Sequence, residues 1–383
     1  MAGNKILIVD SDAASRNFID AALKKGGHQV LQVASGKEGL IFAWRDRPEL
    51  IIIDPTLSDL KGEDLAIRLR QDVRTAHTPL IALSSDPQAS RARSCTESGF
   101  NEYLVKTPQA IPALIEAVDR LLGSQAVDQK AGGLLIAFLS AKGGTGTSSL
   151  CANIAANIVT NKPEAQVVVV DLVLPIGSIA DIVGYQGDQN LVTVADMPSS
   201  AITPKFFQNN LTEIANWNFH LLAGSPDPEN GNLLKVGSIS DIISSLKAAY
   251  DYILIDLGRS LSRISLPLIE HADLIALIVS TDVSTISLTK TVWRYLQSKG
   301  MEAHTVYAIL NRAVGLEGLT KAEAEKIIGL QIRSSVPHLG GNFTLANNQH
   351  VPFSQKFPKD TTAIVFKELA QEMADLARRQ RTG

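Results

Sequence analysis

The feature that most constrains the fold is a repeated alternation of short apolar runs with amphipathic segments of helical period. The alternation occurs twice, over residues 5–122 and again from residue 133 onward. It is typical of parallel sheets covered by helices, and several runs of the second series are continuously apolar, as in strands buried on both faces. We therefore expect an α/β protein with two doubly wound, three-layer domains.

The apolar runs predict the strands and the domain boundaries. In the first domain they cover residues 5–10, 28–33, 50–54, 79–85 and 101–106. In the second they cover residues 133–140, 165–171, 219–224, 250–258, 273–281 and 305–311. A polar stretch ending in two glycines separates the two series, and this is linker composition. The expected boundaries are 1–123 for the first domain, 124–133 for the linker and 134–383 for the second domain.

Composition argues against several classes of protein. The net charge of −3 argues against a surface built for nucleic acid. The apolar runs fall short of the roughly 20 residues that a membrane-spanning helix needs, so we expect a cytoplasmic protein. Cys95 and Cys151 lack metal-ligand spacing and are expected to be buried thiols.

Polar residues stand at the ends of four runs in the first domain. They are Asp10, Asp54, Ser84 and Lys106. Because ligands gather at the carboxyl ends of parallel strands, we expect these side chains to converge. Two carboxylates can hold Mg²⁺, while the lysine offsets charge on phosphoryl oxygens. Ordinary polar strand ends are the weaker explanation, since four positions coincide.

With these positions, the first domain resembles a CheY-like response-regulator receiver domain. The resemblance implies a flavodoxin-like sheet with strand order 2-1-3-4-5. It also implies that Asp54 is the phospho-acceptor and that Asp10 belongs to the acidic pair that holds Mg²⁺. Ser84, Tyr103 and Lys106 match the switch hydroxyl, the switch aromatic residue and the lysine of the family.

The acidic pair of the receiver family is incomplete in this sequence. Ser11 stands where the second acidic residue belongs, and Asp12 follows one position too late. Side chains alternate in direction along a strand, so Asp12 is not expected to substitute. The loss should weaken Mg²⁺ binding. Phosphorylation of Asp54 and a docking role without phosphorylation both stay open.

The second domain opens with a strand, a glycine-rich loop and a helix. Gly143, Gly144 and Gly146 allow backbone N–H groups to approach phosphate oxygens, and the helix directs its positive end at the same anion. Ser148 stands where an ordinary phosphate-binding loop places its Mg²⁺-ligating hydroxyl. The strand–loop–helix context favours a nucleotide site over a purely structural turn.

Three later residues add to this candidate site. Asp171 and Asp256 each end an apolar run, and an aspartate in such a position beside a phosphate-binding loop commonly holds the water shell of Mg²⁺. Asn311 ends another run, where its amide can read the adenine edge or serve the turn that follows.

On these motifs, residues 134–383 resemble the MinD/ParA group of deviant Walker ATPases. The resemblance implies a mostly parallel P-loop sheet, ATP and Mg²⁺ as cofactors, and catalytic roles for Lys142, Asp171 and Asp256. Lys142 matches the lysine that reaches across an ATP-sandwiched homodimer in that group. The implied nucleotide-binding residues are Lys142, Gly143, Gly144, Thr145, Gly146, Thr147, Ser148 and Asn311.

Two departures from the MinD/ParA pattern bear on hydrolysis. Thr147 replaces the second lysine of the loop, which grips phosphate. Val173 replaces the second carboxylate of the first switch segment. Stabilising the transferring phosphoryl group and orienting water depend on such groups. We therefore expect ATP binding with slow or absent hydrolysis.

The order of the two domains matches a narrower group. A receiver-like domain followed by a lysine-deviant MinD-like domain resembles the TadZ/CpaE family of Flp (Tad) pilus systems. The resemblance implies a dimeric localisation and assembly factor that works with a secretion ATPase and other pilus-assembly proteins. It also implies recruitment to a cell pole, or to the inner membrane through partners. An active ATPase controlled by receiver phosphorylation, a signalling protein and a scaffold without nucleotide binding are the alternatives.

The end of the chain permits two interpretations. Residues 361–383 carry apolar side chains at helical spacing followed by a basic terminus. This pattern fits an amphipathic membrane anchor or a final helix packed on the sheet. We favour the packed helix, because bulky residues suited to membrane insertion are lacking beyond Phe366.

Overall fold

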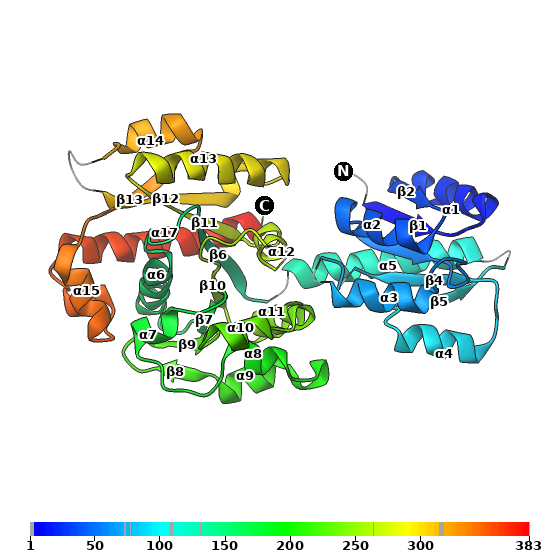
Figure 1. The fold of residues 1–383 in the computed structure, drawn as a ribbon, viewed down its shortest axis with the longest axis horizontal. Coiled ribbons are helices and arrows are strands. Elements are labelled where there is room, and N and C mark those ends of the chain that lie inside the picture. Colours follow the sequence, from blue (N-terminus) through cyan, green and yellow to red (C-terminus); the bar gives the residue numbers. More distant parts are fainter. Residues whose placement is uncertain are drawn as a thin grey trace. The chain divides into compact units, whose positions relative to one another are not determined.

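The computed structural model describes residues 4–72, 74–76, 78–107, 110–130, 132–262, 264–313 and 318–382. The chain divides into two compact units, Met1–Lys130 and Ala131–Gly383 (Figure 1). Each unit is described by itself. The division falls inside the segment 124–133, whose composition is that of a linker.

The first unit contains a five-stranded parallel sheet. Its strands are β1 (Lys5–Val9), β2 (Gln29–Val33), β3 (Leu50–Ile53), β4 (Leu80–Ser84) and β5 (Glu102–Val105). They pair in the order β2-β1-β3-β4-β5, which confirms the order expected from the sequence. The reversal of order beside β1 brings the carboxyl ends of β1 and β3 together, where ligands bind in such sheets.

Helices cover both faces of this sheet. They are α1 (Ala13–Lys25), α2 (Gly36–Asp46), α3 (Gly62–Gln71), α4 (Ala89–Glu97) and α5 (Ala110–Lys130). Ile6 and Ile8 of β1 pack in one apolar cluster with α1 and α5, and Leu7 and Val9 pack in another with α2, α3 and α4. Successive strand side chains point to opposite faces, which produces two apolar layers. Helix α5 continues through residues 124–130.

The second unit is built on an eight-stranded sheet. Its strands are β6 (Leu134–Ser140), β7 (Val167–Asp171), β8 (Thr212–Ile214), β9 (Phe219–Leu222), β10 (Tyr252–Asp256), β11 (Leu274–Ser280), β12 (Val306–Ala313) and β13 (Ile332–Pro337). The order is β13-β12-β11-β6-β10-β7-β9-β8, and every pair is parallel except β8 with β9. The mostly parallel α/β fold is confirmed. The sequence missed the two edge strands, β8 and β13.

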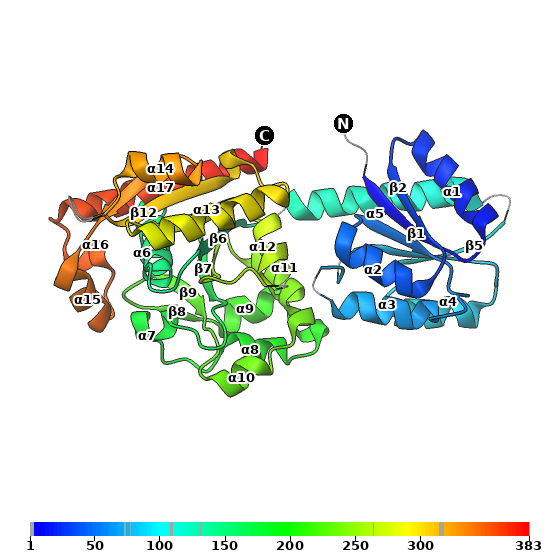
Figure 2. The ribbon, with the colours of Figure 1, turned by 45° about the horizontal axis from the view of Figure 1, so that its top comes forward.

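Two layers of helices enclose this sheet. The longer helices are α6 (Thr147–Asn161), α9 (Pro204–Asn210), α11 (Ile239–Ala249), α13 (Val283–Ser298), α14 (Lys321–Ile328), α15 (Gly340–Asn348) and α17 (Thr361–Thr382). The shorter ones are α7 (Ile179–Val183), α8 (Leu191–Ala195), α10 (Pro228–Asn232), α12 (Ser265–Glu270), α16 (Phe353–Lys356) and the 3₁₀ turns Ser199–Ala201, Val236–Ser238 and Ala303–Thr305. Helices α6 and α17 share one apolar cluster, and α11 and α13 share the other. Helix α14 lies beside α13 (Figure 2).

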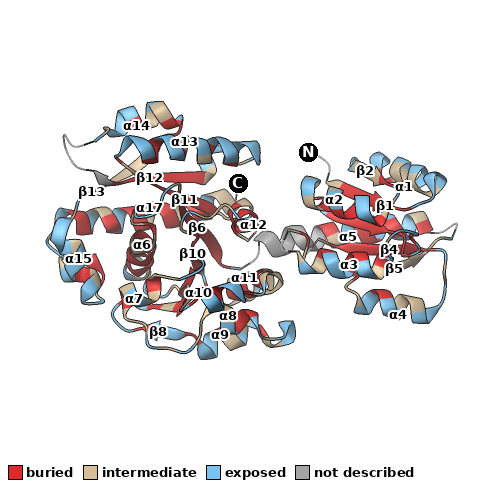
Figure 3. Cartoon of the chain, in the orientation of Figure 1, coloured by how far each residue is buried: buried red, intermediate tan, exposed pale blue. Residues whose placement is uncertain are grey.

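Burial follows the pattern expected from the apolar runs. Strands β6, β7 and β10 are buried along their whole length, and so is most of α6 (Figure 3). Cys95 lies buried on α4 and Cys151 lies buried on α6, both with free thiols, as expected. The glycine-rich loop is therefore held at both ends by buried elements, since it begins after β6 and ends at α6.

The last helix packs on the sheet. On α17, Phe366, Leu369 and Met373 are fully or almost fully buried in the cluster shared with α6. Near its end, Arg381 Nη2 lies 2.5 Å from Asp273 Oδ2. The packed-helix interpretation is thereby confirmed over the membrane anchor. Within the described ranges, none of the helices combines the length and the apolar character needed to cross a membrane.

Candidate functional site

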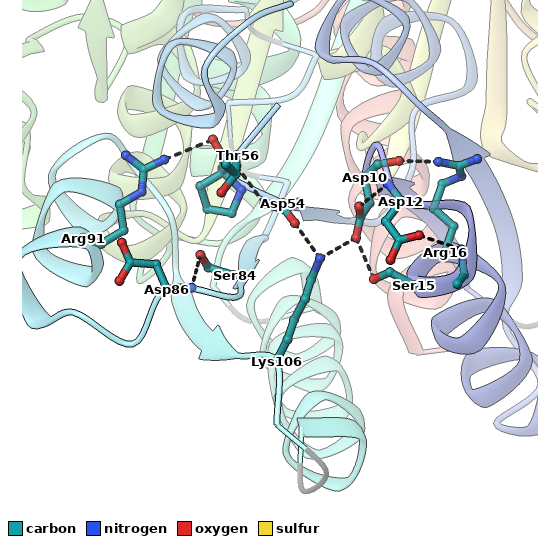
Figure 4. A network of polar contacts seen from close by, with 12 residues as sticks. Asp10, Asp12, Ser15, Arg16, Asp54, Thr56, Ser84, Asp86, Arg91 and Lys106 are labelled. Atoms are coloured by element: carbon teal, nitrogen blue, oxygen red, sulfur yellow. Dashed lines mark hydrogen bonds and ion pairs between the residues drawn. The ribbon is translucent and has the colours of Figure 1, made fainter. Parts of the chain in front are cut away.

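The structure brings together three of the polar residues that end strands of the first sheet. Lys106 Nζ lies 2.7 Å from Asp10 Oδ2 and 2.5 Å from Asp54 Oδ2 (Figure 4). Both aspartates are buried. Burial lowers the pKa of Lys106, but hydrogen bonds to the two carboxylates outweigh it and raise that pKa. The ammonium group thus bridges Asp10 and Asp54.

Further donors occupy the same carboxylates. Asp10 Oδ1 accepts a hydrogen bond from Asp12 N at 2.8 Å, and Asp10 Oδ2 accepts a second one from Ser15 Oγ at 2.7 Å. Asp54 Oδ1 accepts from Thr56 N at 2.7 Å. The sequence did not point to Ser15, which lies in the first turn of α1.

The position after Asp10 supplies no second carboxylate. Ser11 is exposed, and Asp12 accepts from Ala14 N at 3.0 Å as the N-cap of α1. A capping side chain satisfies the first turn of its helix, so Asp12 is engaged elsewhere. In the part of the chain that the structure describes, no group of three or more metal-binding side chains assembles. A Mg²⁺ ion here would have Asp10 and Asp54 as its carboxylate ligands.

The residues expected to form the switch of the first unit make a separate chain of contacts. Ser84 Oγ accepts from Asp86 N at 3.1 Å, and Tyr103 OH donates to Asp86 O at 2.6 Å. Arg91 of α4 contacts the loop that follows Asp54, since its Nη2 donates to Pro55 O at 3.1 Å. The sequence missed Arg91, because nothing in its spacing connects α4 to that loop.

In the second unit, the glycine-rich loop joins β6 to α6 and leaves open space. Gly144 and Gly146 have φ angles of +79° and +87°, which L side chains rarely adopt. A Cβ at Gly143 or Gly144 would meet no atom within 4 Å. Packing within the chain therefore does not require glycine at position 143. A ligand that approaches the loop backbone closely would require it, because a side chain there would be in the way.

The two threonines of the loop contact each other. Thr145 Oγ1 and Thr147 Oγ1 share a hydrogen bond at 3.0 Å, and both side chains are buried. Asn311, at 5% exposure, donates from Nδ2 to Thr145 O at 2.6 Å. Thr147 thus contributes to the shape of the loop, and Asn311 lies against the loop backbone.

Lys142 is exposed and paired within its own chain. Its Nζ lies 3.2 Å from Asp282 Oδ1 and 3.0 Å from Ser284 Oγ. Asp282 is the N-cap of α13 and also accepts from Thr285 N. Burial raises the pKa of Asp282, but its hydrogen bonds with Ser284, Thr285 and Lys142 outweigh this and lower it strongly.

Asp171 and Asp256 end neighbouring strands in register and are fully buried. Asp256 Oδ1 accepts from Gly258 N at 2.9 Å, whereas the buried Oδ2 accepts no hydrogen bond from any described residue. Burial, and then the charge of Asp171, raise the pKa of Asp256 to about 7, although the Ser148 side chain and the Gly258 N–H act on the carboxylate in the opposite direction. An unpaired buried carboxylate oxygen is unusual and indicates a missing donor or cation.

The oxygens of Asp171, in contrast, already have partners. Oδ2 accepts from Ser178 N at 2.7 Å and from Ile179 N at 2.9 Å, and Oδ1 accepts from Val173 N at 3.1 Å. Burial raises the pKa of Asp171 and these three bonds oppose the rise. Asp171 therefore fixes the loop after β7.

Comparison with known proteins gives the family of the first unit and the fold of the second. Residues 6–119 match the family model of the response regulator receiver domain, and the first unit is a receiver domain. The second unit has the fold of the MinD and ParA ATPases. The chain thus joins a receiver domain to a unit with a P-loop ATPase fold.

The curated relatives share the receiver part. The phosphate regulon transcriptional regulatory protein PhoB of Pseudomonas aeruginosa is 31% identical over 140 residues, which are 36% of this chain and 61% of PhoB. The transcriptional regulatory protein AfsQ1 of Streptomyces coelicolor is 32% identical over 133 residues, which are 34% of this chain and 58% of AfsQ1. The chain spans less than two thirds of the length of either relative.

Solved structures provide the fold of the second unit. A ParA family ATPase from Chlorobium tepidum has a TM-score of 0.57 and 23% identity, with 63% of this chain and 98% of that chain covered. The septum site-determining protein MinD of Pyrococcus horikoshii, complexed with Mg-ADP, has a TM-score of 0.54 and 20% identity, with 65% and 98% covered. At these identities the similarity shows the fold.

Proposed function

We propose that the second unit binds ATP with Mg²⁺ at the glycine-rich loop. The observation that carries the proposal is the buried Oδ2 of Asp256, which lacks a donor among the described residues. A hydrated Mg²⁺ ion supplies such donors and offsets phosphate charge when bound. Ser148 and Asp256 would hold the ion, and the open space at Gly143 and Gly144 leaves room for phosphate groups.

Hydrolysis at this site should be slow or absent. Replacement of the loop lysine removes charge-assisted hydrogen bonds of roughly 1.5–3 kcal/mol, which is about a ten- to hundredfold loss in affinity. Binding survives such a loss, because the loop backbone and the start of α6 still act on the phosphates. Turnover is affected more, since Thr147 is hydrogen-bonded to Thr145 and Val173 brings no carboxylate.

ATP should then act as a link between two copies of the chain, with Lys142 reaching across. The pair of Lys142 with Asp282 is solvent-exposed, so breaking it costs little. Lys142→Ala is expected to abolish dimers that form in Mg-ATP, as measured by light scattering with and without the nucleotide. The exposed Lys321→Ala on α14 is the control and should dimerise normally. A Lys142→Ala chain that dimerises as well as the unaltered one would refute the sandwich.

In the cell, we propose a localisation and assembly role in a Flp (Tad) type pilus system, with a secretion ATPase among the partners. A site that holds ATP without rapid turnover suits a factor that gathers partners and transforms no substrate. Removing the gene from its native host should abolish these pili, and a copy with Asp256→Asn should fail to restore them. Normal piliation without the gene would exclude this role.

The second candidate is an ATPase controlled by phosphorylation of the receiver domain. The contact of Asp54 and Asp10 with Lys106 favours it, since acceptor, acidic residue and lysine lie together. Acetyl phosphate with ample Mg²⁺ should then label the unaltered chain and leave Asp54→Ala unlabelled. Because one carboxylate of the acidic pair is missing, labelling should need a high Mg²⁺ concentration. The absence of label at any concentration would exclude this candidate.

A further inference from the structure

We propose that Asn311 is a positioning residue for the phosphate-binding loop. The inference rests on the nucleotide site proposed above. Asn311 lies on β12, and its Nδ2 donates to Thr145 O at 2.6 Å. A Cβ at Gly146 would lie 2.6 Å from the same nitrogen. The amide therefore fills the space directly against the turn of the loop.

This contact fixes the orientation of one peptide group in the loop. The carbonyl of Thr145 and the N–H of Gly146 belong to the same planar trans peptide, so they point in opposite directions. Holding the carbonyl against Asn311 turns the N–H of Gly146 away from β12. Loops of this kind bind anions through successive N–H groups that point to a common side. Asn311 thereby sets the direction of a phosphate donor without touching phosphate.

Position 147 makes this support more important. Thr147 is hydrogen-bonded to Thr145 Oγ1, which also donates to Lys142 O at 3.2 Å. The loop thus has two internal supports at Thr145, one through its hydroxyl and one through its carbonyl. Since position 147 carries no cation, the backbone donors provide a larger share of phosphate binding, and their geometry matters correspondingly more.

The contact with Thr145 is separate from any contact with a base. The amide of Asn311 has two N–H donors and one acceptor, and the bond to Thr145 O uses one of the donors. A ligand without a base therefore reports on the positioning role alone.

The test compares ligands with and without a base. Affinities of the full chain for Mg-ATP, Mg-GTP and Mg-tripolyphosphate are measured by calorimetry, together with the ligand-free Tm. Asn311→Leu, which keeps the branching of the side chain, and Asn311→Ala are each expected to weaken all three ligands about tenfold, as the loss of one hydrogen bond implies. Because tripolyphosphate carries no base, its loss of affinity reports on the loop alone. Weakened tripolyphosphate binding at an unchanged Tm separates positioning from a purely structural role.

The control substitutes an asparagine at the other end of α6, the helix that follows the loop. Asn161→Ala removes an amide that donates to Lys367 O at 2.8 Å at the far end of α6, and it should change each affinity less than twofold. A loss confined to ATP, with tripolyphosphate unaffected, would make Asn311 a base reader and overturn the inference. If the unaltered chain binds none of the three ligands, the proposed nucleotide site itself fails.

Discussion

Replacing Asp256 with asparagine is expected to stabilise the second unit and at the same time to abolish Mg²⁺-dependent ATP binding. Folding raises the pKa of this carboxyl from its ordinary value of 3.8 to about 7. The unfolded chain therefore ionises Asp256 more easily, and the contribution of this group to stability falls as the pH rises from about 4 to about 7. Above pH 7 the cost reaches about 4 kcal/mol.

Asparagine removes that charge. In Mg²⁺-free buffer at pH 8, Asp256→Asn should raise the free energy of unfolding by about 2–4 kcal/mol, and the fall between pH 4 and 7 should shrink. Urea unfolding followed by the fluorescence of Trp217 and Trp293 measures it in a Trp44→Phe background, since Trp44 lies in the other unit. Asp188→Asn, an exposed change in the loop before α8, should alter stability by less than about 0.5 kcal/mol. An Asp256→Asn chain that is less stable at pH 8, or that still binds Mg-ATP, would contradict the proposed role of Asp256.

Replacing Arg70 with methionine is expected to cost the receiver domain about 3 kcal/mol of stability, because several backbone acceptors lose a charged donor together. Arg70 donates from Nε and Nη2 to Gly99 O, and from Nη1 to Ala76 O and Thr78 O at 2.9 and 2.8 Å. Its Nη2 also reaches Asn101 Oδ1 at 2.8 Å. Burial lowers the pKa of this guanidinium to about 10.

Hydrogen exchange of the β4 and β5 peptides across a urea series measures this loss inside the full chain. The matched control is Arg68→Met, because Arg68 lies on the same helix and is exposed. It should change the free energy of unfolding by less than about 0.5 kcal/mol. Equal effects of the two substitutions would mean that the contacts of Arg70 contribute little.

The sequence predicted the elements that are both long and strongly apolar. The five strands of the receiver and six strands of the second unit were recognisable. Most of them are buried parallel strands, which leave nearly continuous apolar runs, whereas β2 and β5 are only partly buried. Strands β8 and β13 were missed for physical reasons: β8 has three residues, and β13 contains Arg333, Ser334 and Ser335. The polar end of α5 was likewise not separable from a linker by composition.

The sequence identified which residues lie at the two sites, but it did not predict which side chains contact one another there. Strand-end positions identified Asp10, Asp54 and Lys106, because topology alone brings them to one edge. Local spacing gives no information on pairs that are distant in the chain, such as Lys142 with Asp282 or Asn311 with Thr145.

The account centres on a nucleotide that is held and not consumed. The most direct measurement incubates the full chain with Mg²⁺ and ATP labelled on both the base and the γ-phosphate, isolates the dimer, and identifies the bound species over several hours. We expect intact ATP on the dimer, with both labels in equal amounts. Release of labelled phosphate and ADP at the rate of an ordinary ATPase would contradict the account of Thr147 and Val173.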